Sequence, residues 1–472
     1  MNMRVCAVQT EPYGALSGRQ RGHLALRAAS GLLVLLFGSA ATAAPVRTAL
    51  DNGLKVCIAE DDATDTVALA ILVRATADCE PDDKAGLRIV VQHALQAGLS
   101  ERLESDPGLG GLLDAEDSGG GASFSSEWEY VWLGYEGMSQ TLPDALPVLA
   151  TALFRPQISE AHFAAAREQV LAAVEGPVSA PAASTMGLFR LALLGRASRA
   201  YPLGTPGTIN GLTLGDATAF HRRYYVPALS TVAVVGPVDA AQTQALIARC
   251  LGDLPAGDAN LPPAPPTLTR PDVHVAANAR LSPGSDQHMD IASLVVGVPA
   301  PGLGDPDEGV THVIHALLAG GTEGGRLERD DHLWQSLGFP SHEGGRRRNF
   351  VESLQPPTSQ RGHLAIHAYA APRQAETVRE ALLKQFDDLR AHGAQAGELA
   401  TAKDRTIGAL TSPYDLPSNR ALLMGRACLL GEADSTGRSL IQQVAEVTVE
   451  DVQRVARAWF GVHAVGLELP EP

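Results

Sequence analysis

Short apolar runs bounded by turn-forming residues recur along the chain and predict β-strands. In the first half these runs lie at 53–60, 67–75, 121–126 and 130–134. Between the second and the third, the stretch GLRIVVQHALQAGL at 86–99 carries apolar residues at helical spacing. The pattern therefore predicts two strands, a helix and two further strands, followed by more helices.

The same order of elements returns in the second half of the chain. Strands are predicted at 272–277, 291–298 and 363–371, with a helix at 310–321 and a long amphipathic helix at 375–393. The repeated order indicates an old duplication. Because strands and helices come in runs and do not alternate strictly, we predict an α+β fold of two homologous domains, each an antiparallel-rich β-sheet covered by α-helices.

Prolines and small polar residues replace the apolar pattern at 256–271. Such a composition predicts an extended linker on the surface. The linker separates an N-terminal domain at 44–255 from a C-terminal domain at 272–472, and each domain is long enough to bury a core of its own.

The first 43 residues have a different composition. Several arginines precede the apolar run GLLVLLFGSA, and the small residues of ATAA follow it. This is the pattern of a secretory signal peptide, so we expect 1–43 to be removed and the protein to be exported to the periplasm. A buried helix at the start of the fold is the alternative.

Charge and cysteine content narrow the function classes. The 472 residues carry a formal net charge of −16, and an acidic chain is a poor nucleic-acid binder because phosphate contacts need a basic face. Beyond the signal, no apolar run approaches membrane-spanning length, so no permanent membrane span is expected. Four cysteines follow residue 43 without a metal-type spacing. A disulfide is allowed in an exported compartment, but the sequence does not assign one.

One histidine in an apolar helix is the first candidate for chemistry. Ile89, Gln92 and His93 stand at i, i+3 and i+4 and share a helix face. A later predicted helix carries Glu168 and Glu175 seven residues apart, again on one face. Two such helices can bring these groups to one point. The alternative is a hydrogen-bonded core histidine with a solvated glutamate face.

Several segments resemble the pitrilysin/insulinase-type family, the inverzincin metallopeptidases. The opening NGLKVCIAEDDATDT resembles the start of that family's first domain and leads into the helix that carries H-x-x-E-H in active members. The most specific match is YPLGTPGTINGLTLGDATAFHRRYYVPALSTVAVVGPVD, which is similar to the end of the first domain. Further matching segments are 154–175, 316–330 and 447–461.

The resemblance implies a zinc site that has lost its chemistry. It places Ile89 at a lost ligand position, Gln92 at the general-base position, and His93 and Glu175 as remnant ligands, with Glu168 supporting them. A catalytic zinc needs three protein ligands and a water, and isoleucine has no lone pair to donate. A glutamine amide cannot take a proton from that water. We therefore expect zinc binding to be weak or absent.

The second domain and the edge strand depart from the family pattern too. Trp334 and Ser341 occupy the positions where the family places an arginine and a tyrosine to hold the substrate carbonyl. In the segment that resembles the substrate-pairing edge strand, Ser123 and Phe124 replace the usual asparagine and alanine. Strand addition by a peptide remains possible without a metal.

Two other groups have simpler interpretations. His312 and His315 stand at i, i+3 on a predicted helix, but no third metal ligand is visible nearby, so an ordinary helix is favoured. The basic run 346–348 attracts anions in principle, and a solvated loop or strand start is favoured there.

The family resemblance implies the function. We expect a non-catalytic subunit that forms a hetero-oligomer with a catalytically competent, HxxEH-bearing relative and encloses a peptide or unfolded polypeptide for processing in the periplasm. The alternatives are an active zinc metalloendopeptidase with an altered metal site, and a stand-alone peptide-binding or scaffold protein.

Overall fold

A computed structural model supplies the structure. It shows two β-sheets of mainly antiparallel strands together with many helices, which confirms the α+β prediction. Residues Pro45–Pro472 form one compact unit. The predicted signal peptide at 1–43 and part of the predicted linker lie outside the described residues. The described residues are 44–105, 108, 121–175, 181–195, 200–263, 272–277, 291–319, 325–337, 351–354, 362–432 and 438–470.

The first sheet has six strands in the order β1-β2-β6-β3-β5-β4. Strands β2 and β6 pair in parallel, and the other neighbours are antiparallel. Strand β6 follows the other five in sequence and inserts between β2 and β3. The bounds are β1 Val46–Ala49, β2 Lys55–Glu60, β3 Thr66–Val73, β4 Gly121–Ser126, β5 Val131–Met138 and β6 Ser230–Gly236.

The second sheet repeats this topology with one strand fewer. Its order is β7-β11-β8-β10-β9, with β7 and β11 parallel and the other pairs antiparallel. Strand by strand it corresponds to β2-β6-β3-β5-β4, which agrees with the predicted duplication. The bounds are β7 Asp272–Ala277, β8 Ala292–Ala300, β9 Val351–Leu354, β10 Gly362–Ala370 and β11 Ala464–Leu469.

Each sheet buries one face against helices of its own half. In the first half, the main core joins the sheet to α1, α4, α5 and α10 through aliphatic side chains, and in the second half to α11, α14, α15 and α18. The helices of the first half are α1 Leu87–Ser105, α4 Leu142–Phe154, α5 Glu160–Glu175, α6 Pro181–Leu194, α8 Pro206–Asn210, α9 Leu214–Tyr224 and α10 Ala240–Leu251. Those of the second half are α11 Glu308–Ala319, α12 Arg326–Arg329, α13 Asp331–Ser336, α14 Ala375–His392, α15 Ala396–Thr411, α16 Pro417–Leu430, α17 Arg438–Glu446 and α18 Val449–Trp459.

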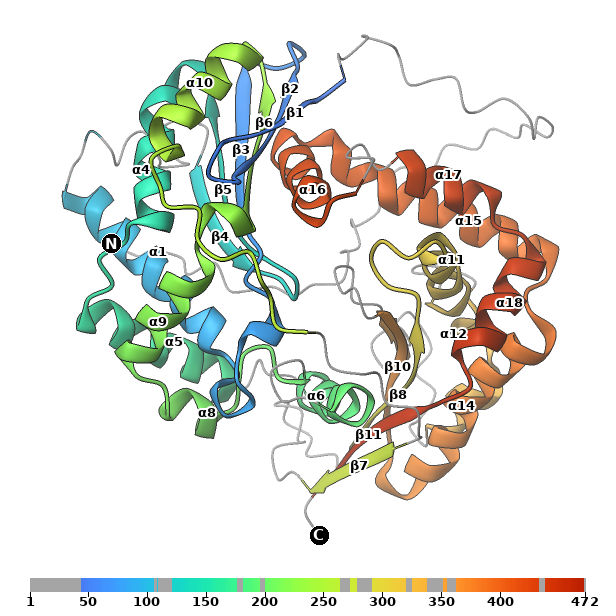
Figure 1. Cartoon of the computed structure of the whole chain (residues 1–472). Coiled ribbons are helices and arrows are strands. Elements are labelled where there is room, and N and C mark those ends of the chain that lie inside the picture. The colour runs from blue at the N-terminus through green and yellow to red at the C-terminus, as the bar shows by residue number, and fades with distance from the viewer. Residues whose placement is uncertain are drawn as a thin grey trace. The chain divides into compact units, whose positions relative to one another are not determined.

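The opposite face of each sheet is covered by a helix from the other half (Figure 1). Helix α6 of the first half contacts β7, β11 and β8, and helix α16 of the second half contacts the equivalent strands β2, β6 and β3. The two halves therefore exchange one helix each. The sequence pattern did not predict this exchange. The predicted domain bounds at 256–271 stay a prediction.

In the part of the chain that the structure describes, no helix combines the length and apolarity needed to cross a membrane.

Candidate functional site

Helix α1 begins at a point fixed by a buried carboxylate. Glu80 is 1% exposed, and its Oε1 accepts the backbone N–H of Arg88 at 2.5 Å. The first N–H groups of a helix have no partner within the helix, so a carboxylate placed there satisfies them and interacts favourably with the helix dipole. Gly86 has φ +94°, and a Cβ at this position would lie 2.6 Å from the carbonyl oxygen of Leu203. The start of α1 is thus held by both polar and steric constraints.

The predicted site residues of α1 lie on its buried side. Ile89 is 6% and Gln92 is 4% exposed, and His93 is half-buried. Burial lowers the pKa of His93 because it disfavours the imidazolium form. The side chain is therefore a neutral imidazole at neutral pH. Ile89 belongs to the main core of the first half.

Helix α5 packs against α1 through an apolar face. Its buried residues are Phe163, Ala166 and Val170, at helical spacing, and they share a core with Ile89. Glu168 and Glu175 lie outside this face and are exposed. The predicted contact between the two helices is therefore present, and the predicted ligand roles of His93 and Glu175 stay predictions.

The donor set does not fit a catalytic zinc. Ile89 supplies no lone pair and Gln92 no basic carboxylate, and a catalytic zinc takes three protein ligands. Among the described residues, no group of three or more histidine, cysteine, aspartate or glutamate side chains is arranged to hold a metal ion.

A buried charge cluster beside the site was missed by sequence reasoning. Arg88 is fully buried, and its charge lies close enough to act on Glu127 and Tyr225. Burial raises the pKa of Glu127, and Arg88 opposes that rise. For Tyr225 burial also raises the pKa, with Arg88 opposing and Glu80 adding to the rise. Since arginine is rarely buried without partners, the single arginine in the apolar stretch 86–99 was the available signal.

The other sequence candidates fall in ordinary surroundings or outside the described residues. Trp334 on α13 donates its Nε1–H to the carbonyl of Leu327 at 2.9 Å and packs against the second core. Ser341 and the run 346–348 lie outside the described residues. On α11, His312 Nε2 is 3.7 Å from Glu308 Oε1.

Strand β4 is the outermost strand at one end of the first sheet and pairs with β5. Within the described sheet its other edge has no strand partner. Ser123 is exposed and Phe124 is half-buried. An outer strand of this kind offers N–H and C=O groups to an extended chain.

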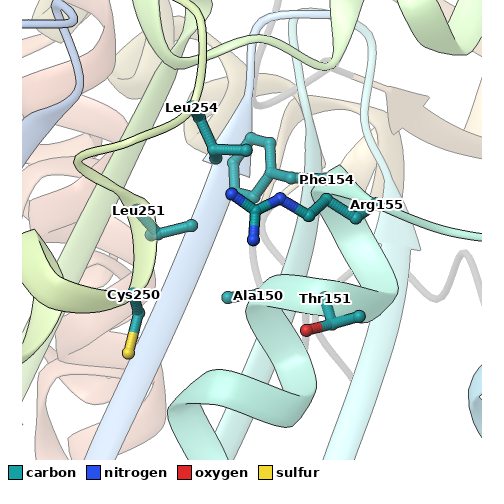
Figure 2. Close-up of a pocket in the computed structure, with 7 residues that line it drawn as sticks. All are labelled: Ala150, Thr151, Phe154, Arg155, Cys250, Leu251 and Leu254. Atoms are coloured by element: carbon teal, nitrogen blue, oxygen red, sulfur yellow. The ribbon is translucent and has the colours of Figure 1, made fainter.

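Figure 2 shows a small pocket between α4 and α10. It contains none of the predicted site residues, and its polar groups include the guanidinium of Arg155, which pairs with Asp253 through two contacts of 2.8 Å. The pocket therefore does not belong to the candidate site. Its lining residues are Ala150, Thr151, Phe154, Arg155, Cys250, Leu251 and Leu254.

Comparisons with known proteins find matches among peptidases of one family. Residues 211–406 match the family model described as the Peptidase M16 inactive domain. The chain is 24% identical over 445 residues to uncharacterized zinc proteases of Mycobacterium bovis and Mycobacterium tuberculosis, an alignment that covers 92% of this chain and 96% of each relative.

Solved structures share the fold. A protease from Helicobacter pylori superposes with a TM-score of 0.73 at 17% identity, covering 91% of this chain and 100% of that chain. A peptidase M16 inactive domain from Pseudomonas fluorescens gives a TM-score of 0.74 at 18% identity, covering 91% and 98%. The family model, the relatives and the fold agree, and the resemblance to the pitrilysin/insulinase-type metallopeptidases is confirmed.

Proposed function

We propose that this chain is a non-catalytic M16 subunit that pairs with an HxxEH-bearing relative and, together with it, encloses and processes peptides in the periplasm. One observation carries the proposal: Ile89 and Gln92, which the resemblance assigns to the ligand and base positions of this helix, are both buried. The isoleucine side chain cannot ligate zinc. The glutamine amide cannot accept a proton from a zinc-bound water. The chain therefore contributes binding surface, and bond cleavage falls to the partner.

Strand β4 supports the binding part of the proposal. Because it ends the strand order of the first sheet, an extended peptide can add to it as a further strand. Backbone hydrogen bonds of this kind accept many sequences, which suits a chain that holds unfolded polypeptide.

A second candidate is an active zinc peptidase with an altered site. It is favoured by the relatives named zinc proteases and by the neutral imidazole of His93, which is the form of histidine that binds metals. A stand-alone peptide-binding or scaffold protein is the third, and strand β4 is compatible with it. The three differ in zinc content, in peptide cleavage and in the need for a partner.

Zinc content and peptide cleavage separate the first two candidates. We expect the purified wild-type chain to contain no stoichiometric zinc and to cleave no unstructured peptide. The variant that combines Ile89→His with Gln92→Glu restores a ligand and a base. The matched controls are the two single variants: the first adds a ligand without a base, the second a base without a ligand. Chelator-sensitive cleavage by the wild-type chain would overturn the proposal.

Partner pairing is tested on native extract. We expect the tagged full chain to copurify with an HxxEH-bearing M16 chain and to elute from size-exclusion chromatography as a complex larger than one subunit. A strictly monomeric species without such a relative would count against pairing. If that monomer still binds extended peptides with an affinity unchanged by chelator, the stand-alone binding protein becomes the better description.

Export is tested by the N-terminus of the mature protein. We expect a periplasmic fraction in which the chain begins near Ala44, because Ala41-Thr42-Ala43 matches the small-residue pattern of a signal-peptidase site. A chain that retains residues 1–43 and stays in the cytoplasm would contradict the proposed location.

A further inference from the structure

Helix α16 approaches the first sheet unusually closely. A Cβ on Gly425 would lie 2.4 Å from Leu72 Cδ1 and 3.0 Å from Ala233 Cβ, so any larger residue here requires its neighbours to shift. The sheet offers small side chains to the helix, which lets the two backbones come together. The buried small residues in this contact are Cys57, Ala59, Ala68, Ala70, Ala233 and Ala421.

Two cysteines from opposite halves of the chain meet in this contact. Cys57 on β2 is fully buried, and Cys428 on α16 is half-buried and packs against the same cluster. Their side chains lie close enough for each thiol to affect the ionisation of the other. Both are free thiols in the structure. The sequence separates them by 370 intervening residues, which is why spacing alone did not pair them.

The surroundings of Cys428 favour its thiolate. Lys55 Nζ donates to the backbone carbonyls of Cys428 at 3.1 Å and Leu429 at 2.9 Å, and Arg47 Nη1 donates to the carbonyl of Glu432 at 2.8 Å. The hydrogen bond from Cys57 and the charges of Lys55 and Arg47 outweigh burial and lower the pKa of Cys428 to about 7. The pKa of Cys57 is raised by its hydrogen bond with Cys428 and by burial. Cys428 is therefore the thiol that ionises first.

We propose that Cys57 and Cys428 form a reversible disulfide that ties helix α16 to strand β2, with the disulfide of a small-molecule or protein thiol oxidant as electron acceptor. A disulfide needs its two sulfur atoms about 2.05 Å apart, and packing in one cluster brings the two side chains together. The bond joins the two halves of the chain at the place where they exchange a helix.

The chemistry is two successive thiol–disulfide exchanges. The Cys428 thiolate attacks one sulfur of the oxidant, which forms a mixed disulfide and releases the first thiolate. Cys57 then loses its proton, its sulfur attacks Cys428 Sγ, the mixed disulfide breaks and the second thiolate leaves. The two cysteines lose two electrons, and the oxidant disulfide gains them and becomes two thiols that carry the two protons.

The test uses the purified full chain equilibrated in glutathione buffers of increasing oxidised fraction, then quenched with acid, alkylated and digested for mass spectrometry. We expect a linked pair of peptides that contains Cys57 and Cys428 and has lost two hydrogens. The Cys57→Ser variant removes the resolving thiol, so it is expected to hold glutathione on Cys428. A control that combines Cys79→Ser with Cys250→Ser is expected to form the same linked pair as wild type.

Reactivity gives a second readout that does not depend on the bond itself. At pH 7 we expect Cys428 to be alkylated about fivefold to tenfold faster than Cys250, because its thiolate fraction is higher, although a lower pKa also reduces intrinsic nucleophilicity. Lys55→Met should lower the alkylation rate of Cys428, and Lys55→Arg should leave that rate unchanged. The proposal is overturned if Cys57 and Cys428 both stay reduced in the most oxidising buffer, or if the oxidised product links Cys79 or Cys250 instead.

Discussion

Helix α6 packs against β7, β11 and β8, and helix α16 packs against the equivalent strands β2, β6 and β3. Both crossings are close and both depend on glycine. On α16 the glycine is in the helix, at Gly425, whereas α6 meets glycines of the strands: a Cβ on Gly466 would lie 2.4 Å from the carbonyl oxygen of Thr185, and one on Gly297 would lie 2.6 Å from Phe189 Cζ. Each crossing therefore has glycine at the contact, in the helix at α16 and in the strands at α6.

The two crossings differ in what they bury. Under α6, the hydroxyl of Thr185 hydrogen-bonds Glu468 Oε2 at 2.9 Å and Ser293 Oγ at 2.8 Å, and Ser293 Oγ lies 3.1 Å from His367 Nε2. Under α16 the contact is mainly apolar, and its polar groups include the two thiols and the buried hydroxyl of Thr231. A buried polar network tolerates one arrangement of its members, because any shift leaves a polar group without a partner. Apolar contacts do not specify the position of a helix along a sheet as strictly. We therefore expect the polar contacts at the two ends of α16 to fix its position.

The largest expected effect comes from filling the α16 crossing. Gly425→Leu forces a side chain into space already occupied by Leu72 and Ala233, and we expect it to lower the free energy of unfolding by about 3 kcal/mol. Urea denaturation followed by circular dichroism measures this. The matched control is Gly408→Leu on α15, where a Cβ meets nothing within 4 Å, and it should be neutral or slightly stabilising. Equal losses in both variants would show that the crossing is not tightly packed.

Removing one hydroxyl from the α6 crossing should cost somewhat less. Thr185→Val keeps the shape and removes the hydrogen bonds to Glu468 and Ser293, so we expect a loss of about 2 kcal/mol, since a bond to a charged group is among the stronger ones. Thr185→Ser retains the hydroxyl and should recover most of that loss. If valine and serine behave alike, the network does not hold α6 in place.

Acid should weaken the α16 crossing at its first turn. Arg420 of α16 pairs with Asp61, whose carboxylate is 8% exposed. Burial raises the pKa of Asp61, but the hydrogen bond from Arg420, the backbone N–H of Ala63 and the charge of Arg420 together outweigh it, and the net pKa lies below the ordinary value of 3.8. A depressed carboxylate pKa stabilises the fold above the unfolded value and loses that contribution as pH falls through the folded value. We therefore expect the roughly 1 kcal/mol stability difference between wild type and Asp61→Asn at pH 7 to shrink below about pH 4 in urea titrations.

The smallest expected effect lies at the other end of α16. Lys55 places its ammonium on the last carbonyls of the helix, where a positive charge complements the helix dipole. Lys55→Met should lower the free energy of unfolding by about 0.5 to 1 kcal/mol, with a smaller loss at high salt. Lys55→Arg keeps a charge there and serves as the control. If the methionine variant melts at the same temperature as wild type, Lys55 does not stabilise the end of α16.

Much of the fold follows from local pattern. The strand and helix predictions in both halves fall on observed elements, because alternation and helical spacing depend only on neighbouring residues. Predicted helix 86–99 is α1, which continues to Ser105. The pattern did not predict the pairing of β6 between β2 and β3, nor the exchange of α6 and α16. Both depend on contacts between residues far apart in sequence, and PSNRALLMGRACLL does not indicate which sheet it covers.

The candidate site shows the same limit. Spacing correctly places Glu168 and Glu175 on one helix face, but Phe163, Ala166 and Val170 take the buried face and leave both glutamates exposed. The sequence offered a signal for the burial of Arg88, but not its neighbour Glu127, because that residue lies 39 positions further along the chain.

The helix exchange also has a consequence for the order of folding. The strands of the first sheet end at Gly236, yet the helix that covers the second face of this sheet ends at Leu430. A chain that has folded only its first half therefore exposes an apolar sheet face until the second half docks, and transiently exposed surfaces of this kind favour aggregation.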